Sequence, residues 1–197
     1  MKLVAATNNQ KKLIELRALL TEAGVEVLSL ADSGYTKEIP ETGTTFLENA
    51  FQKARTIMDV SGLPAIADDS GLEVEALGGD PGVYSARYGG DACKTDADRN
   101  ALLLRNMEGK GNRNARFVSA IACVFPDGTE LSAIGTCEGI LLEAPRGDGG
   151  FGYDPLFLFP DLGKTMAEIS AELKNKISHR ANAMRLFFEQ WKGIQNA

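Results

Sequence analysis

Short apolar runs and a longer amphipathic segment divide the first part of the chain into predicted strands and a helix. The runs Lys2–Ala6 and 25–30 are typical of buried strands. Between them, leucines recur at helical spacing from Lys12 onward, and Gly24 is expected to end that helix. Residues 31–44 are polar and carry few helix or strand signals, so we expect a loop there.

A capping signal marks the start of a second helix. Thr45 is followed three residues later by Glu48, the spacing at which two side chains cap each other's backbone N–H groups at a helix start. Apolar residues then repeat at helical spacing until Gly62, which is expected to close the helix. The apolar run 63–67 predicts a strand that ends before the Asp-Asp-Ser-Gly sequence at 68–71.

The middle of the chain predicts a β-hairpin. The segments 115–125 and 129–142 are strand-like, and the Pro-Asp-Gly sequence at 126–128 between them is typical of a turn. Upstream of the hairpin, residues 96–107 predict a helix. Downstream, the glycine-rich segment 145–153 is expected to form a loop.

The last part of the chain predicts a short strand and a terminal helix. The strand is expected at 156–159, Thr165 and Glu168 repeat the capping spacing, and Ser178 is expected to cap the final helix. Helices and strands therefore mix along the chain, which indicates an α/β fold with a mixed sheet. The length fits one domain, residues 1–197, or one domain with two lobes.

Composition and charge exclude several classes of protein. Hydrophobic residues make up 44% and charged residues 24% of the chain, as in ordinary globular proteins. Acidic residues outnumber basic ones by 27 to 21, so the chain would repel a phosphate polymer and we expect no nucleic-acid partner. Neither a membrane span nor a secretion signal is visible. The 3 cysteines include no Cys-x-x-Cys pair, which argues against a disulfide framework or zinc ribbon and favours a cytoplasmic protein.

Three familiar patterns occur without the context that they require. Residues 147–152 match G-x-G-x-x-G, but a strand rather than a helix is predicted to follow, so we reject dinucleotide binding. The Gly-Lys-Thr sequence at 163–165 resembles the end of a P-loop, but Leu158 stands where that loop needs glycine. His179 is the single histidine, so neither a Ser-His-Asp triad nor a histidine-rich zinc site has support.

Asp68 and Asp69 form the strongest local signal for function. Two adjacent carboxylates after an apolar strand are costly unless something positive is near, and active sites of open α/β sheets lie at strand ends. Mg²⁺ prefers oxygen ligands and often takes one or two carboxylates together with phosphate oxygens. The alternative is a solvated turn, since Asp, Ser and Gly are favoured there. Glu41 and Lys53 carry no such signal, and each alone is typical of a protein surface.

Three further segments carry candidate ligand groups, each with a structural alternative. Thr7–Lys12 is a strand-to-helix junction whose backbone N–H groups can cradle a phosphate, or can simply be capped. Phe151–Asp154 offers aromatic rings and a carboxylate that suit a purine, unless the rings fill the core. Ser178–Arg180, with Lys174 upstream, gathers hydrogen-bond donors at a helix start, or is a cap with surface charge.

Taken in order along the chain, these segments closely resemble the inosine/xanthosine triphosphate pyrophosphatase family, also called the Ham1-like or dITP/XTP pyrophosphatases. The match spans nearly the whole chain, and no motif position departs from the family pattern. The matching segments are Thr7–Asn9 with Lys12, Glu41–Gly43, Phe46 with Glu48–Ala50, Lys53–Ala54, Ala67–Leu72, Pro81–Tyr88, Phe151–Pro155, Gly163–Thr165 and Ser178–Arg180.

The resemblance implies an elongated, mixed α/β fold with helices flanking the sheet and the active site in a cleft between two lobes. It also implies a homodimer, a Mg²⁺ requirement, and cleavage of ITP, dITP and XTP to a monophosphate and pyrophosphate. By matched position, Asp69 would act as general base and would bind the metal with Glu41. Asp68 and Lys53 would be catalytic residues close to the site of the reaction. The substrate would be bound by Thr7, Asn8, Asn9, Gln10, Lys11, Lys12, Ser70, Phe151, Gly152, Tyr153, Asp154, Lys174, His179 and Arg180.

Three other functions are weighed against this one. A general nucleotide pyrophosphatase, such as the related septum-inhibitor-like family, would differ in base preference. A nucleotide-binding sensor would bind ITP without releasing pyrophosphate, but it has no need of a water-activating carboxylate. A structural or interaction protein would explain none of the paired motifs.

Overall fold

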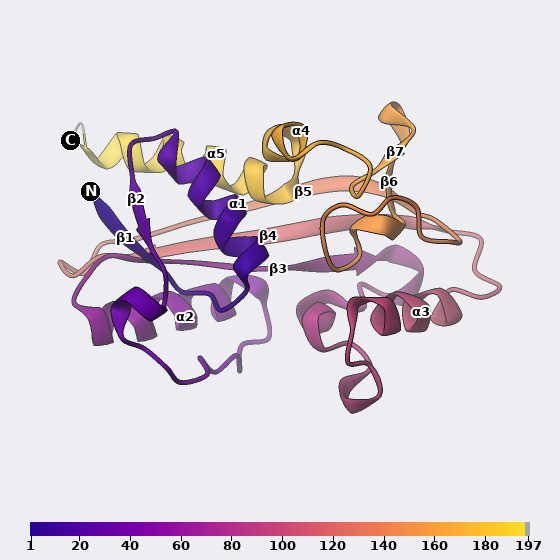
Figure 1. Ribbon diagram of the computed structural model, residues 1–197, viewed down its shortest axis with the longest axis horizontal. Helices are drawn as coiled ribbons and strands as arrows, with labels where there is room; N and C mark the ends of the chain where they lie inside the picture. Colours follow the sequence, from indigo (N-terminus) through magenta and orange to yellow (C-terminus); the bar gives the residue numbers. More distant parts are fainter. Residues whose placement is uncertain (196–197) are drawn as a thin grey trace. The chain divides into compact units, whose positions relative to one another are not determined.

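The computed structural model describes residues 1–195, and within them helices flank a single mixed sheet (Figure 1). In order across the sheet, the strands are β2 (Glu26–Leu28), β1 (Lys2–Ala5), β3 (Ala65–Val74), β4 (Asn114–Val124), β5 (Glu130–Leu141), β6 (Phe157–Phe159) and β7 (Lys164–Thr165). β1 is parallel to β2 and β3, whereas β6 is antiparallel to β5 and β7. The predicted α/β fold with a mixed sheet is therefore confirmed.

The residues group into two compact units, each with its own hydrophobic core. The first unit contains Met1–Asp69, Ser119–Gly135 and the chain from His179 onward, and the second contains Ser70–Val118 and Thr136–Ser178. The first unit holds the helices α1 (Gln10–Thr21), α2 (Phe46–Ser61) and α5 (His179–Gln195), and the second holds α3 (Asp96–Asn106) and α4 (Ala171–Ile177). The cleft expected from the family resemblance stays a prediction.

In the first unit, α1 and α5 pack against one face of the sheet and α2 covers the other (Figure 1). Leu13, Leu16 and Leu20 of α1 share a core with Phe187 and Trp191 of α5. Their spacing of three or four residues places them on one face of each helix. Full burial of such a side chain contributes about 1.5–3 kcal/mol, so these helices are held firmly beside the strands that carry the site.

The second unit has a core rich in aromatic rings. Leu103 of α3 and Met107, the residue that caps the end of α3, share it with Phe117 of β4 and with Phe157 of β6. The Phe117 and Phe157 ring centroids lie 4.8 Å apart, within the range in which tilted aromatic pairs attract. Tyr153, at the end of the glycine-rich loop, belongs to the same core, which anchors that end of the loop.

The acidic segment lies inside β3, whereas the sequence had predicted that it follows the end of a strand. β3 runs from Ala65 to Val74, so Asp68 and Asp69 are both strand residues. The parallel partner β1 ends at Ala5, which pairs with Ile66, so the two aspartates lie just beyond the carboxyl end of β1. A solvated turn is the usual outcome for such a sequence, but here both carboxylates are buried between cations that neutralise them.

Several local signals are confirmed. Thr45 and Glu48 form the reciprocal capping box at the start of α2, and Gly62 ends the helix with a φ of 65°, a conformation that favours glycine. The hairpin between β4 and β5 closes with a hydrogen bond from the Phe125 N–H to the Thr129 carbonyl at 2.9 Å.

Other helix boundaries differ from the prediction. Thr165 lies in β7, and its N–H donates to the Glu168 carboxylate at 2.7 Å, so the second capping pair closes a turn instead of starting a helix. Ser170 instead caps α4, a helix that the sequence pattern did not predict because it spans only 7 residues. At α1 the expectation holds: the helix begins at Gln10, and the side chain of Asn9 caps it, as the capping alternative for this segment predicted.

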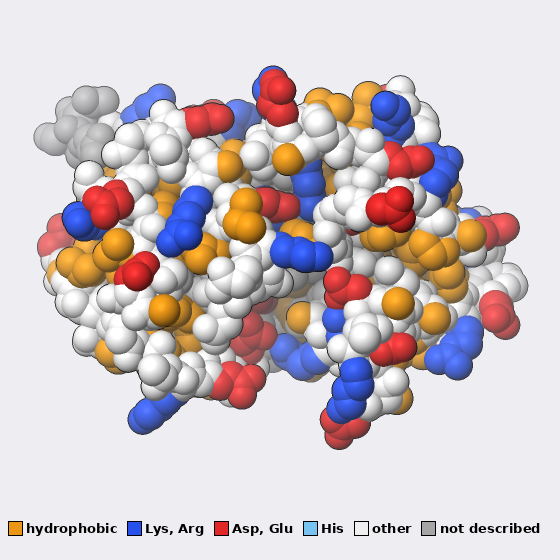
Figure 2. All heavy atoms as spheres, viewed as in Figure 1, with side chains coloured by type: hydrophobic (Ala, Val, Ile, Leu, Met, Phe, Trp, Pro, Cys, Tyr) orange, Lys and Arg blue, Asp and Glu red, His pale blue; other side chains and the backbone are white. Residues whose placement is uncertain are grey.

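No helix within residues 1–195 combines the length and the apolarity that a membrane span requires. On the face shown in Figure 2, basic and acidic side chains are intermixed, and no continuous basic stripe crosses it.

Candidate active site

Asp68 lies at the centre of a buried network of charges in the first unit. Its Oδ2 atom lies 3.0 Å from Lys12 Nζ and 2.9 Å from Arg180 Nη2, and Ser119 Oγ donates to Oδ1 at 2.5 Å. Burial by itself would raise the pKa of Asp68, but the charges of Arg180 and Lys12, with the hydrogen bonds, hold it well below its usual value. A carboxylate that is 1% exposed and engaged at both oxygens favours a positioning role over proton transfer.

Arg180 reaches Asp68 from the first turn of α5 and also pairs with Glu15 of α1. Gly135 of β5 permits the close approach of α5, because an added Cβ there would lie 2.1 Å from a backbone nitrogen of the helix. Burial would lower the pKa of Arg180, but Asp68 and Glu15 raise it above its usual value, so the guanidinium stays charged. His179, which precedes Arg180, is itself buried at 5% exposure.

Lys53 joins the two carboxylates that were predicted to be metal ligands. Its Nζ atom donates to Asp69 Oδ1 at 2.7 Å, to Glu41 Oε1 at 3.0 Å and to the backbone carbonyl of Asp68 at 3.2 Å. Burial would lower the pKa of Lys53, but the charges of Asp69 and Glu41 and the hydrogen bonds to them outweigh it and raise the pKa. The structure therefore brings these predicted residues together around one ammonium group.

The helix that carries Lys53 also fixes the loop that carries Glu41. Asn49 Oδ1 accepts the Gly43 N–H at 2.8 Å, while Asn49 Nδ2 donates to Asp69 Oδ2 at 3.3 Å. Gln52, one turn further along α2, binds the same loop through its side-chain oxygen. Side chains on one face of α2 thus bind the loop that carries Glu41 and contact the carboxylates of both Glu41 and Asp69.

The oxygen atoms around Lys53 Nζ suit a hard divalent cation. The carboxylates of Glu41 and Asp69 and the carbonyl of Asp68 converge on one point. Mg²⁺ usually takes one or two carboxylates and completes its shell with water and phosphate oxygens. Within residues 1–195, no group of three or more His, Cys, Asp or Glu side chains is arranged to hold a metal.

The Thr7–Lys12 junction is organised as a helix cap. Asn9 Oδ1 accepts the N–H groups of Lys11 at 3.0 Å and Lys12 at 3.2 Å, so the capping alternative holds for Asn9. Lys12 connects the segment to Asp68, and its side chain keeps 15% exposure. Phosphate binding by this segment stays a prediction. Its exposed members are Asn8, Asn9, Gln10 and Lys11, whereas Thr7 is half-buried.

Asp154, Lys174 and Phe151 form a second cluster of predicted site residues, in the second unit. Lys174 Nζ donates to Asp154 Oδ2 at 2.6 Å and lies 4.7 Å from the centroid of the Phe151 ring. Asp154 Oδ2 also accepts the Phe151 N–H at 2.9 Å. Because a cation over a ring face is attracted to it, these contacts together fix one aromatic ring, one donor and one acceptor in a small volume.

Helix α3 braces the glycine-rich loop next to this cluster. Asp96 Oδ2 accepts the Gly152 N–H at 2.8 Å, and Asn100 Nδ2 donates to the Gly152 carbonyl at 3.1 Å. Asp96 and Asn100 are four residues apart and so share a helix face. The Tyr153 hydroxyl donates to the Ser85 carbonyl at 2.9 Å, so this ring serves the core, which was the structural alternative for it.

The predicted residues therefore divide between the two units. The first unit holds Thr7–Lys12, Glu41, Lys53, Asp68, Asp69, His179 and Arg180, and the second holds Ser70, Phe151–Asp154 and Lys174. That both clusters serve one substrate stays a prediction.

Sequence reasoning missed several residues that contact these clusters. Asn49 lies in a segment that matched the family pattern, which is a signal that could have found it. The others have partners far away in the sequence, so no local pattern marks them. The missed residues are Glu15, Asn49, Asp96, Asn100 and Ser119.

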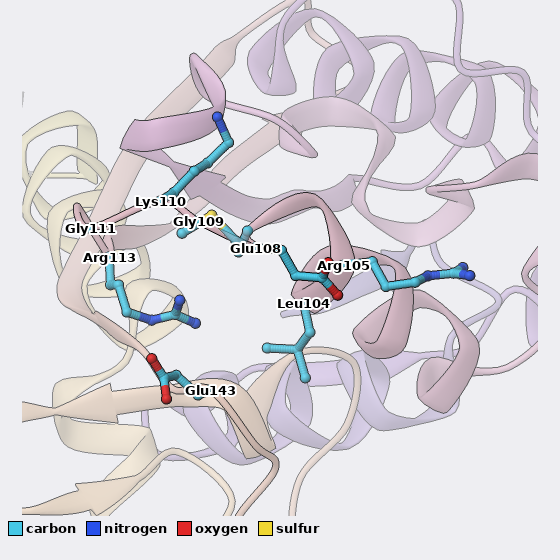
Figure 3. Close-up of a pocket in the computed structure, with 9 residues that line it drawn as sticks. Leu104, Arg105, Glu108, Gly109, Lys110, Gly111, Arg113 and Glu143 are labelled. Carbon is cyan, nitrogen blue, oxygen red and sulfur yellow. The ribbon is translucent and has the colours of Figure 1, made fainter.

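None of the predicted site residues lines the pocket shown in Figure 3. It has a volume of about 460 Å³ and lies between the end of α3, with Leu104 and Arg105, on one side and Arg113 and Glu143 on the other. Arg113 Nε and Nη2 donate to the carbonyls of Leu141 and Leu142, which ties the guanidinium to the wall. The lining mixes both signs of charge, so we assign no part of a triphosphate reaction to it. The charged residues are Arg105, Glu108, Lys110, Arg113 and Glu143.

Known proteins resemble this chain over nearly its whole length. The sequence profile of the Ham1 family matches residues 3–190. The chain is 53% identical to a dITP/XTP pyrophosphatase of Thermus thermophilus, over 98% of this chain and 92% of that protein. It is 50% identical to a dITP/XTP pyrophosphatase of Geobacillus kaustophilus, over 98% of this chain and 95% of that protein.

Solved structures show the same similarity. The Ham1 protein of Staphylococcus aureus superposes with a TM-score of 0.87 at 39% identity, covering 98% of this chain and 99% of that one. A nucleoside-triphosphatase / dITP/XTP pyrophosphatase of Mycobacterium abscessus superposes with a TM-score of 0.73 at 45% identity, covering 91% of this chain and 95% of that one.

Proposed function

The chain belongs to the Ham1 family, and from this premise we propose that it hydrolyses the aberrant purine nucleotides dITP, ITP and XTP to a monophosphate and pyrophosphate. Such a reaction removes damaged nucleotides from the nucleotide pool. The observation that carries the proposal is the convergence of Glu41 and Asp69 on one cation, which provides the charge pattern that a metal-assisted phosphoanhydride hydrolase needs.

We infer that Glu41 and Asp69 bind Mg²⁺ together with the triphosphate. When bound, Mg²⁺ would neutralise charge that develops on the phosphate oxygens. Asp69 would accept a proton from the water whose oxygen forms a bond to the α-phosphorus, and the bond to pyrophosphate would break. Lys12 and Lys53 would stabilise the departing pyrophosphate electrostatically. Asp68 would act as a positioning residue that keeps Lys12 in place.

We assign base selection to the second cluster. Inosine and xanthine carry a carbonyl at C6, where adenine carries an amine, and a buried donor favours the carbonyl. Arg180 is less suited than Lys174 to supply this donor, because Glu15 and Asp68 already engage its guanidinium. Lys174, held beside the Phe151 ring, can donate to the edge of a base that stacks there.

Pyrophosphate release is expected to be fast with ITP and XTP and slower by about 10²-fold or more in kcat/KM with ATP, because a mismatched donor is left unpaired. GTP is also expected to be a poor substrate; guanine shares the C6 carbonyl, so this expectation requires that its C2 amine be excluded or left unpaired. Removing divalent cations with EDTA should abolish release from every substrate. The measurement is a pyrophosphate-release assay on this panel. Equal efficiency with ITP, ATP and GTP would indicate a general nucleotide pyrophosphatase, and ITP binding without release would indicate a sensor.

We also propose that the protein works as a homodimer, as the family resemblance implies, and that it resides in the cytoplasm, as its cysteine pattern predicts. The cysteines Cys93, Cys123 and Cys137 are buried thiols, which suits a reducing compartment.

A further inference from the structure

Lys53 occupies the point at which the proposed metal ligands meet. Its Nζ atom lies 2.7 Å from Asp69 Oδ1, 3.0 Å from Glu41 Oε1 and 3.2 Å from the Asp68 carbonyl oxygen. Three oxygen atoms, two of them from charged groups, therefore surround one ammonium. The side chain of Lys53 is only 8% exposed, so bulk water screens these interactions weakly.

A divalent cation would need the same oxygen atoms. Mg²⁺ binds carboxylate oxygens at about 2.0–2.1 Å, closer than the ammonium of Lys53 approaches Glu41 and Asp69. An ammonium and a divalent cation so close together repel each other, and the repulsion is strong where water is largely excluded. Lys53 and the metal therefore compete for Glu41 and Asp69.

We propose that Lys53 is the internal counter-ion of the metal site: it holds Glu41 and Asp69 in the metal-free protein and releases them when the metal enters with the substrate. This inference rests on the proposed function, which supplies the two metal ligands. The triphosphate brings oxygen atoms that can accept the displaced ammonium, so the nucleotide compensates for the ion pairs that Lys53 loses. Metal affinity is therefore low for the protein alone and high with nucleotide present, and the coupling is reciprocal.

A role in phosphate binding alone would have a different consequence. If Lys53 only contacted the substrate, its removal would weaken nucleotide binding and would not tighten metal binding to the nucleotide-free protein. The affinity of the protein for a metal ion in the absence of nucleotide thus separates the two roles.

The test is Mn²⁺ binding without nucleotide, measured by electron paramagnetic resonance on wild type, Lys53→Met and Lys110→Met. Lys53→Met is expected to bind Mn²⁺ tighter by roughly tenfold or more, because the competing charge is gone. Lys110 is exposed beyond the end of α3 and belongs to neither site cluster, so Lys110→Met makes the same change in net charge and should leave the affinity as in wild type. If Lys53→Met binds Mn²⁺ no tighter than wild type, the counter-ion role is overturned.

Thermal unfolding gives a second readout. Lys53→Met leaves Glu41 and Asp69 without this cation, so its melting temperature in EDTA should be lower than that of wild type. Saturating Mn²⁺ should restore the melting temperature of the variant. Lys53→Gln, which keeps a hydrogen-bond donor, is measured in the same way if Lys53→Met does not fold in EDTA. Failure of both variants to recover with Mn²⁺ would also overturn the role, because the metal is expected to replace the charge of Lys53.

Failure of the proposed function would show separately, as wild-type protein that releases no pyrophosphate from ITP with Mg²⁺. Tighter Mn²⁺ binding by Lys53→Met would still support the counter-ion role in that case. Conversely, an active wild type with unchanged Mn²⁺ affinity in Lys53→Met would remove the counter-ion role and leave the proposed function standing.

Discussion

Replacing Asp69 with asparagine is expected to lower the turnover of ITP by about 10²–10⁴-fold while the protein stays folded. The variant keeps the shape of the side chain but loses the basic oxygen that would take the proton from water. Lys53 retains Glu41 as a partner at 3.0 Å, so its buried ammonium is not left without a counter-charge. Turnover is measured by pyrophosphate release at saturating ITP and Mg²⁺, and circular dichroism with thermal melting checks the fold.

Asp59→Asn is the matched control for this variant. Asp59 lies on α2 with an exposed side chain, so the same chemical change there should leave turnover at the wild-type level. A folded Asp69→Asn protein with near-normal turnover would show that Asp69 is not the general base.

Replacing Asp68 with asparagine is expected to destabilise the protein by about 3–5 kcal/mol at neutral pH, a typical cost of removing one member of a buried ion pair. Arg180, at 1% exposure, would lose the charge of Asp68 at 2.9 Å, and Lys12 would lose the carboxylate at 3.0 Å. Urea unfolding at pH 7 measures the difference. Asp59→Asn serves again as the control, with an expected change within about 0.5 kcal/mol.

The pH dependence of this loss of stability shows whether the charge of Asp68 causes it. The folded protein holds the pKa of Asp68 well below its ordinary value of 3.8, so its stabilising contribution is fully present above that value. The contribution is lost as pH falls from that value through the lower pKa of the folded state. The difference in stability between wild type and Asp68→Asn should therefore stay constant down to about pH 4 and narrow below it. A difference that already narrows between pH 7 and pH 5 would point to another titrating group.

The elements that were predictable from the sequence are those whose signals are local. The capping box of Thr45 and Glu48, the terminating Gly62 and the turn at 126–128 each act through neighbours within a few residues, so a short window of sequence contains the whole cause. The opposite case is Thr165 with Glu168, where the same spacing closes a turn. No amphipathic segment follows that pair directly, and a cap without one does not start a helix.

The charge network around Asp68 could not be predicted in this way. The sequence at 68–71 is typical of a turn, and it becomes a strand because cations from α1, α2 and α5 neutralise the two aspartates. Arg180 and Glu15 lie 165 residues apart, and Ser119 and Asp68 lie 51 apart. The family resemblance placed Asp68, Asp69 and Lys53 near one another, but only the packing shows that Asp68 is fully engaged while Lys53 bridges the two proposed metal ligands.

The most direct test of the proposed active site is to locate the bound metal and triphosphate. Crystals of the wild-type protein with Mn²⁺ and a non-hydrolysable ITP analogue would reveal the ion by its anomalous scattering. We predict one Mn²⁺ within about 2.5 Å of carboxylate oxygens of both Glu41 and Asp69, bound also to phosphate oxygens, with the Lys53 ammonium moved from between the carboxylates. A triphosphate and an ion that bind elsewhere, with Lys53 still joining Glu41 to Asp69, would contradict the proposed active site.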